Sequence, residues 1–129
     1  MLYDTLIRNA RVIDGSGTPG YSADVAIRGG RIERIGDLRD ARAIDEIDAA
    51  GRVLAPGFID VHTHDDTVVI RQPQMLPKLS QGVTTVIVGN CGISASPVSL
   101  RGDPPDPMNL LGTAQAFVYP SFGDYRVAV

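Results

Sequence analysis

The chain has 129 residues, of which 43% are hydrophobic and 21% are charged, and its formal net charge is −3 at pH 7. This composition is typical of a globular protein and excludes collagen, coiled coils and low-complexity disorder. The basic residues form no runs, so we expect no nucleic-acid partner and no binding to an anionic membrane. The length suits one small domain or a part of a larger one.

Cysteine usage and hydropathy indicate the compartment. The single cysteine, Cys91, cannot form a disulfide within the chain. The first residues lack the basic and then apolar layout of a secretory signal, and no stretch approaches the roughly 20 apolar residues of a membrane span. The sequence therefore predicts a cytoplasmic protein.

Residues 1–55 are predicted to form an antiparallel β region, because short β-type segments alternate with turn residues. The Gly29-Gly30 pair lies between two such segments and predicts a two-residue hairpin turn, since glycine adopts the positive φ angles that this turn requires. The predicted strands are Thr5–Ile7, Arg11–Ile13, Asp24–Arg28, Arg31–Ile35, Ala43–Ile47 and Arg52–Leu54.

The pattern changes after Pro56 to strand, helix and strand, with both strands apolar enough to be buried, which is typical of a parallel βαβ unit. Two further helices are predicted toward the end of the chain. The predicted elements are a strand at Gly57–His62, a helix at Pro73–Gln81 closed by Gly82, a strand at Val83–Val88, and helices at Met108–Phe117 and Phe122–Val129.

His62 and His64, the only histidines, end the first of these predicted strands. Because side chains alternate along a strand, both imidazoles point to the same side, and Asp60 points there with them. Two neutral imidazoles that converge form a metal-chelating pair, for which zinc is the commonest ion. An isolated pair of this kind is more often two exposed or hydrogen-bonded histidines than a metal site, and two ligands are too few for a complete site.

Cys91 follows the next predicted strand. The carboxyl ends of neighbouring parallel strands lie side by side, so its thiol is expected at the same edge of the sheet as the histidines. An isolated cysteine is usually a small buried hydrophobe. Together with the histidine pair, however, it predicts a metal site formed by His62, His64 and Cys91.

The segment Ala55–His64, with the sequence A-P-G-F-I-D-V-H-T-H, resembles the P-G-x-I-D-x-H-x-H signature of the amidohydrolase superfamily. The segments His64–Asp66, Ser80–Val86 and Gly89–Ser94 resemble one branch, the N-acyl-D-amino-acid deacylases, or D-aminoacylases. This resemblance implies an α/β fold, in which a metal-dependent (β/α)₈ TIM barrel carries a small accessory β-sandwich.

On that resemblance, residues 1–55 correspond to the N-terminal β-sandwich portion, and residues 56–129 correspond to the first βα units of the barrel, which is incomplete in this chain. A complete barrel needs about 250 residues. Two further histidines and the aspartate that acts as general base are expected from later strands. No catalytic residue is therefore expected in these 129 residues, and the chain alone is expected to be inactive.

The resemblance also implies roles for the site residues. His62 and His64 would hold the more weakly bound metal, and Cys91 would bridge two metal positions, with one or two Zn²⁺ ions in a complete site. Asp66 stands where dihydroorotase-like members carry an arginine. It either orders the site from behind the ligands or is solvated in its loop.

The implied reaction is zinc-dependent hydrolysis of the amide bond of an N-acyl-D-amino acid, giving a carboxylate and a free D-amino acid. One alternative is a cyclic amidohydrolase or deaminase of the same superfamily, against which Asp66 and the Asn90-Cys91-Gly92 segment argue. The other is a truncated zinc-binding product without turnover, against which the intact ligand motifs argue.

Overall fold

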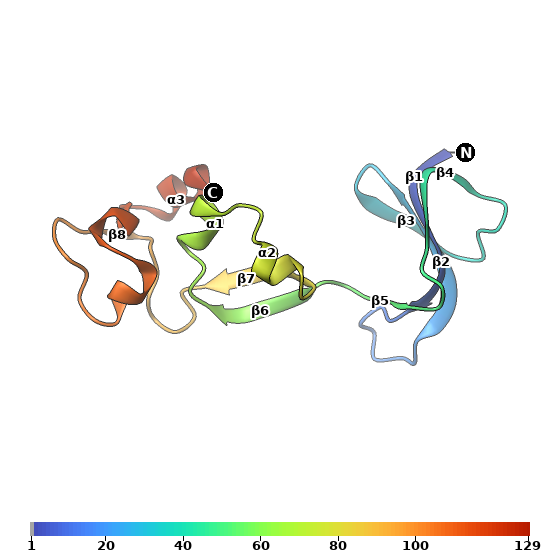
Figure 1. The fold of residues 1–129 in the computed structure, drawn as a ribbon, viewed down its shortest axis with the longest axis horizontal. Helices are drawn as coiled ribbons and strands as arrows, with labels where there is room; N and C mark the ends of the chain where they lie inside the picture. Colours follow the sequence, from blue (N-terminus) through green and yellow to red (C-terminus); the bar gives the residue numbers. More distant parts are fainter. Residues whose placement is uncertain (1) are drawn as a thin grey trace. The chain divides into compact units, whose positions relative to one another are not determined.

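The computed structural model describes residues 2–129, which divide into two compact units, one that extends to Pro56 and one that comprises Gly57–Val129 (Figure 1). Within the described residues, the first unit consists of strands and connecting loops, and all helices lie in the second. None of these helices is long and apolar enough to cross a membrane.

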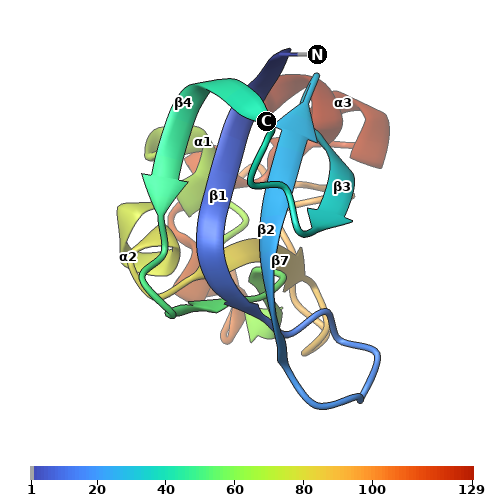
Figure 2. The ribbon, with the colours of Figure 1, turned by 90° about the vertical axis from the view of Figure 1, so that its right-hand side faces the viewer.

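The first unit is a mixed sheet around its longest strand, β1 (Figure 2). β2 pairs antiparallel with β1, and β3 pairs antiparallel with β2, whereas β4 and β5 run parallel to β1. The predicted purely antiparallel sheet is therefore wrong, because the chain crosses from β3 to the far side of β1 before β4 begins. The strands are β1 (Leu2–Val12), β2 (Tyr21–Arg28), β3 (Arg31–Gly36), β4 (Arg42–Asp48) and β5 (Val53–Leu54).

The predicted Gly-Gly hairpin between β2 and β3 is confirmed, with φ angles of 57° at Gly29 and 71° at Gly30. The two strands predicted at the start of the chain are instead one strand, β1, which is interrupted by a bulge. Asn9 lies in this bulge with a φ angle of 55°, and its backbone N–H donates to Asp24 Oδ1 over 2.9 Å. At this bulge two residues of β1, Arg8 and Asn9, lie opposite one residue of β2, so the pairing is interrupted and the alternation of side chains shifts.

The second unit begins with two parallel strands, β6 (Phe58–Thr63) and β7 (Val83–Val88), as predicted. The helix predicted between them is shorter and is preceded by another: α1 is Val68–Arg71 and α2 is Leu76–Leu79. Pro73 lacks an N–H donor and follows the end of α1, and Met75 begins α2 from a left-handed conformation with a φ angle of 45°.

The prediction that both parallel strands are buried is wrong within the described residues. Phe58, Ile59 and Val61 on β6 are 67%, 59% and 52% exposed. Among residues 2–129 only short helices accompany the pair, so in this part of the structure the apolar side chains of β6 lack the second layer that normally covers a parallel sheet.

The end of the chain packs as irregular structure with one regular helix. The helix predicted at residues 108–117 is instead two short 3₁₀ helices, η1 and η2, separated at Gly112, which has a φ angle of 135°. The final predicted helix is confirmed as α3, and a capping box of Ser121 and Asp124 stabilises its start. The elements are β8 (Val98–Ser99), η1 (Met108–Leu111), η2 (Ala114–Ala116), β9 (Val118–Tyr119) and α3 (Phe122–Ala128).

Gly57 marks a close approach between the chain before β6 and the side chain of Thr84 on β7. A Cβ atom at Gly57 would lie 2.1 Å from Thr84 Oγ1 and 2.7 Å from Thr84 Cβ. We expect Gly57→Ala to lower the free energy of unfolding by about 1–3 kcal/mol, because the strands must move apart. Thermal unfolding of the native protein measures this. Gly102→Ala is the matched control, since its Cβ would meet nothing within 4 Å. Equal melting temperatures of the two variants would contradict the prediction.

Candidate metal centre

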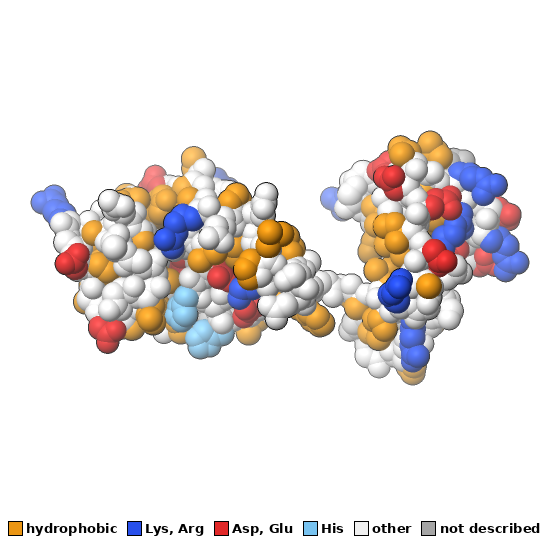
Figure 3. Space-filling view, in the orientation of Figure 1, with side chains coloured by type: hydrophobic (Ala, Val, Ile, Leu, Met, Phe, Trp, Pro, Cys, Tyr) orange, Lys and Arg blue, Asp and Glu red, His pale blue; other side chains and the backbone are white. Residues whose placement is uncertain are grey.

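The structure brings together the three predicted metal ligands. The ligand atoms of His62, His64 and Cys91 all lie within 4.8 Å of one another. Cys91 Sγ is 3.7 Å from each ring nitrogen of His64. His64 is half-buried, whereas His62 and Cys91 are exposed, and the histidines lie on the surface of the second unit (Figure 3).

The parallel pairing of β6 and β7 explains this convergence. Thr63, between the two histidines, pairs with Val88, so β6 and β7 end side by side. Cys91, three residues after Val88, therefore lies at the same edge of the sheet as the histidines. The Asn90 amide Nδ2 donates to the carbonyl oxygen of Val61 over 2.8 Å, which attaches the turn that carries Cys91 to β6.

The three side chains fit a zinc ion by chemistry, and the distance between Cys91 and His64 also fits it by spacing. Imidazole nitrogen and thiolate sulfur are preferred zinc ligands, with Zn–N of about 2.0 Å and Zn–S of about 2.3 Å. In a tetrahedral site these bonds place sulfur and nitrogen about 3.6 Å apart. The separation of 3.7 Å between Cys91 and His64 agrees with that geometry.

Asp66 is completely buried, which excludes the alternative that it is solvated in its loop. Its Oδ1 accepts hydrogen bonds from Ser94 Oγ over 2.6 Å and from the Ala95 N–H over 2.9 Å. Its Oδ2 has no hydrogen-bond partner among the described residues. Asp66 thus joins the loop after His64 to the loop after Cys91.

The last helix, α3, also contacts Asp66. The Tyr125 hydroxyl donates to the backbone carbonyl oxygen of Asp66 over 2.8 Å, and burial of the phenol raises the pKa of Tyr125. Thr67 Oγ1 donates to the carbonyl oxygen of Leu111 over 2.9 Å. Sequence reasoning missed Tyr125, because nothing local connects it with a residue this distant along the chain.

Asp60 does not lie free beside the histidines. Its Oδ2 is 2.6 Å from Lys78 Nζ, and its Oδ1 accepts from the His62 backbone N–H over 3.2 Å. The hydrogen bond from Lys78 holds the pKa of Asp60 below its ordinary value, and the same bond raises the pKa of Lys78. Sequence reasoning also missed Lys78, although it is the only lysine in the chain.

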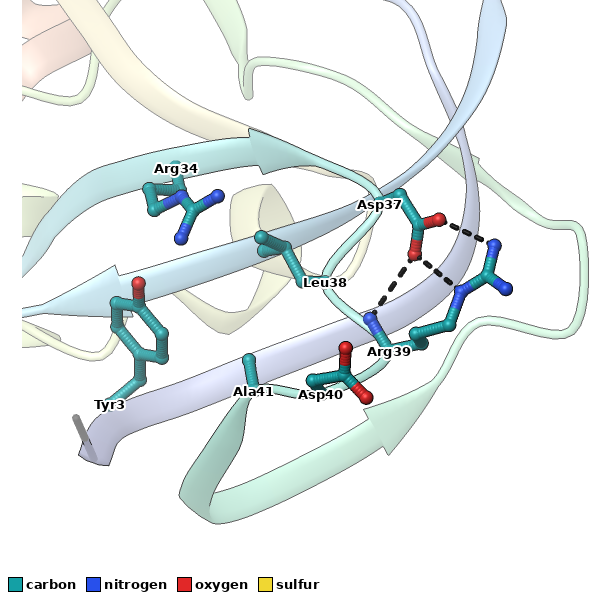
Figure 4. Close-up of a pocket in the computed structure, with 7 residues that line it drawn as sticks. All are labelled: Tyr3, Arg34, Asp37, Leu38, Arg39, Asp40 and Ala41. Atoms are coloured by element: carbon teal, nitrogen blue, oxygen red, sulfur yellow. Dashed lines mark hydrogen bonds and ion pairs between the residues drawn. The ribbon is translucent and has the colours of Figure 1, made fainter.

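A hollow of about 650 Å³ in the first unit carries no comparable chemistry (Figure 4). Its charged lining includes Asp37 and Arg39, which pair with each other at 2.5 Å between Oδ2 and Nη2. None of the seven labelled residues is a histidine or cysteine. The candidate site is therefore the cluster at the ends of β6 and β7.

A comparison with protein-family models agrees with this site. Residues 45–129, which include all three candidate ligands, match the model described as the amidohydrolase family. The chain belongs to the amidohydrolase family. The signature identified in the sequence is thereby confirmed.

Individual relatives of this amidohydrolase are similar over nearly the whole chain. It is 50% identical to a D-aminoacylase of Alcaligenes xylosoxydans xylosoxydans over 127 residues, which are 98% of this chain and 26% of the relative. The predicted resemblance to the D-aminoacylase branch is therefore confirmed. The chain spans about a quarter of the length of the curated relatives that it matches.

Solved structures confirm the fold class. A D-aminoacylase studied for its binuclear metal center superposes with a TM-score of 0.92 and 48% identity, covering 98% of this chain and 26% of that one. A second solved structure is an N-acyl-D-glutamate deacylase from Bordetella bronchiseptica, complexed with zinc and a phosphonate mimic of the tetrahedral intermediate. It superposes with a TM-score of 0.90 and 42% identity, and the match covers 99% of this chain and 27% of that one. This amidohydrolase thus has the fold of metal-containing deacylases.

Proposed function

We propose that the native protein containing these residues is a zinc-dependent deacylase, which hydrolyses the amide bond of N-acyl-D-amino acids to a carboxylate and a free D-amino acid. The observation that carries the proposal is the convergence of His62, His64 and Cys91 at the ends of two neighbouring parallel strands. The 50% identity to a D-aminoacylase supports this substrate class over a cyclic amide or a purine.

In this proposal His62, His64 and Cys91 hold the metal. A bound zinc ion would supply Lewis-acid polarisation of the acyl carbonyl and would lower the pKa of its bound water to about 7. Cys91 serves as a ligand only as a thiolate, and the histidines only when neutral. We therefore also propose a reducing compartment such as the cytoplasm, where the thiol stays free.

We propose that Asp66 fixes the positions of the metal ligands through hydrogen bonds in the surrounding loops. The hydrogen bonds of its carboxylate among the described residues go to Ser94 and Ala95, and these bonds fix the loop of Cys91 relative to that of His64. Removal of a group that fixes the orientation of metal ligands typically lowers the metal affinity.

The remaining catalytic groups are proposed to come from later strands of a (β/α)₈ barrel, of which β6 and β7 are the first two. The exposed apolar side chains of β6 support this, because further barrel elements would cover them. The sheet of residues 1–55 is proposed as part of a β-sandwich. An apolar hollow of about 390 Å³ on that sheet, lined by Ile7, Ile27 and Ile32 among others, supports this assignment.

Substrate profiling of the native protein tests the proposal. We expect release of acetate from N-acetyl-D-leucine, N-acetyl-D-aspartate or N-acetyl-D-glutamate, but not from their L enantiomers. Turnover should be lost on chelation and restored by zinc. Hydrolysis of hydantoin or deamination of adenine, without turnover of any linear D substrate, would instead establish the alternative chemistry. Zinc binding without turnover of any of these compounds would establish a non-catalytic product.

A further inference from the structure

Lys78 is the only lysine in a chain that has twelve basic residues. It lies on α2, and its Nζ contacts three oxygen atoms of the segment that carries the histidines. The distances are 2.6 Å to Asp60 Oδ2, 3.0 Å to Asp65 Oδ2 and 3.3 Å to Thr63 Oγ1. The side chains of Lys78, Asp60 and Asp65 are only 24%, 29% and 15% exposed, so solvent screens these contacts less than at an open surface.

These three partners bracket both histidines. Asp60 precedes His62, Thr63 lies between the histidines, and Asp65 directly follows His64. Two further bonds tighten the segment: Asp60 Oδ1 accepts from the His62 N–H, and Thr63 Oγ1 donates to Asp65 Oδ2. A single ammonium group therefore restrains the segment on either side of each histidine.

We infer that Lys78 is a positioning residue of the metal centre, whose ammonium group fixes the spacing between His62 and His64 by holding Asp60, Thr63 and Asp65. The inference rests on the proposed metal site. It goes beyond that site because Lys78 belongs to a helix outside the histidine motif, and the polar partners of its ammonium group among the described residues are Asp60, Thr63 and Asp65 rather than the candidate ligands.

The geometry favours an ammonium group over a guanidinium group. A lysine ammonium carries three donors around one compact centre, which suits three oxygens gathered around Nζ. Arginine presents its donors in a planar fork that matches one carboxylate with two parallel bonds. Removal of the ammonium group would also leave Asp60 and Asp65 without the cation between them, and their repulsion would loosen the loop.

Metal affinity of the native protein tests this role. We expect Lys78→Met to weaken zinc binding about 10- to 100-fold in a titration against a competing chelator, as for other groups that orient metal ligands. We also expect it to change the absorption bands of the Co²⁺-loaded protein, which report ligand geometry. Lys78→Arg should recover part of the affinity but not the native Co²⁺ spectrum. Arg71→Met is the matched control, because Arg71 lies on α1 and bonds to Thr67 rather than to residues 60–65.

The outcomes separate the two proposals. Native zinc affinity and an unchanged Co²⁺ spectrum in folded Lys78→Met would overturn the role of Lys78 and leave the metal centre standing. Full recovery of both by Lys78→Arg would overturn positioning by showing that any positive charge suffices, and this comparison also decides the matter if the methionine variant does not fold. Failure of the unmodified native protein to bind zinc would overturn both proposals.

Discussion

Cys91→Ala is expected to weaken zinc binding by the native protein about 100- to 1,000-fold. Zinc sites with four protein ligands bind with apparent free energies of about 10–16 kcal/mol, so one ligand contributes about 2.5–4 kcal/mol. The cluster of possible metal ligands among the described residues consists of His62, His64 and Cys91, so no fourth described side chain in it can replace the sulfur of Cys91. Turnover of N-acyl-D-amino acids should fall with zinc occupancy.

Zinc content after dialysis and competition with a chelator measure this effect. Ser99→Ala is a suitable control, because it removes a small polar group from an exposed position on β8, which pairs with β9 and not with β6 or β7. If the Cys91→Ala protein keeps native zinc content and native turnover, Cys91 has no part in the metal centre.

Asp66→Ala is expected to have the second largest effect. The substitution leaves the hydroxyl of Ser94 and the N–H of Ala95 without their acceptor, and Ala95 is fully buried. Loss of these bonds should lower the free energy of unfolding by about 2–4 kcal/mol. Because the same bonds join the loops of His64 and Cys91, zinc affinity should fall about 10- to 100-fold.

Asp66→Asn separates the hydrogen bonds from the charge. Asparagine keeps an oxygen that accepts from Ser94 and Ala95, so this variant should retain most of the stability and zinc affinity. Chemical denaturation and zinc titration of both variants provide the comparison. An Asp66→Ala protein with native stability and native zinc affinity would show that the buried carboxylate does not fix the geometry of the metal centre.

The candidate ligands were predictable because their placement follows from local periodicity. Alternation along one strand puts His62 and His64 on one side, and the parallel βαβ pattern puts Cys91 at the same edge of the sheet. The glycine pair at residues 29 and 30 was predictable for the same reason, since a two-residue turn requires its positive φ angles.

Features that depend on contacts between distant residues were not predictable. The pattern in residues 43–47 predicts a strand but not that β4 pairs with β1 in the parallel direction. The burial of Asp66 depends on Ser94 and Tyr125, and the contacts of Lys78 depend on where α2 lies against β6. None of these partners is marked by a spacing in the sequence.

The most direct test of the metal centre is anomalous diffraction at the zinc edge from crystals of the native protein grown with zinc. We expect an anomalous peak bounded by Cys91 Sγ and the ring nitrogens of His62 and His64, with a Zn–S bond of about 2.3 Å and Zn–N bonds of about 2.0 Å. Zinc bound elsewhere, with no anomalous density between these three side chains, would contradict the assignment of the site and the deacylase mechanism built on it.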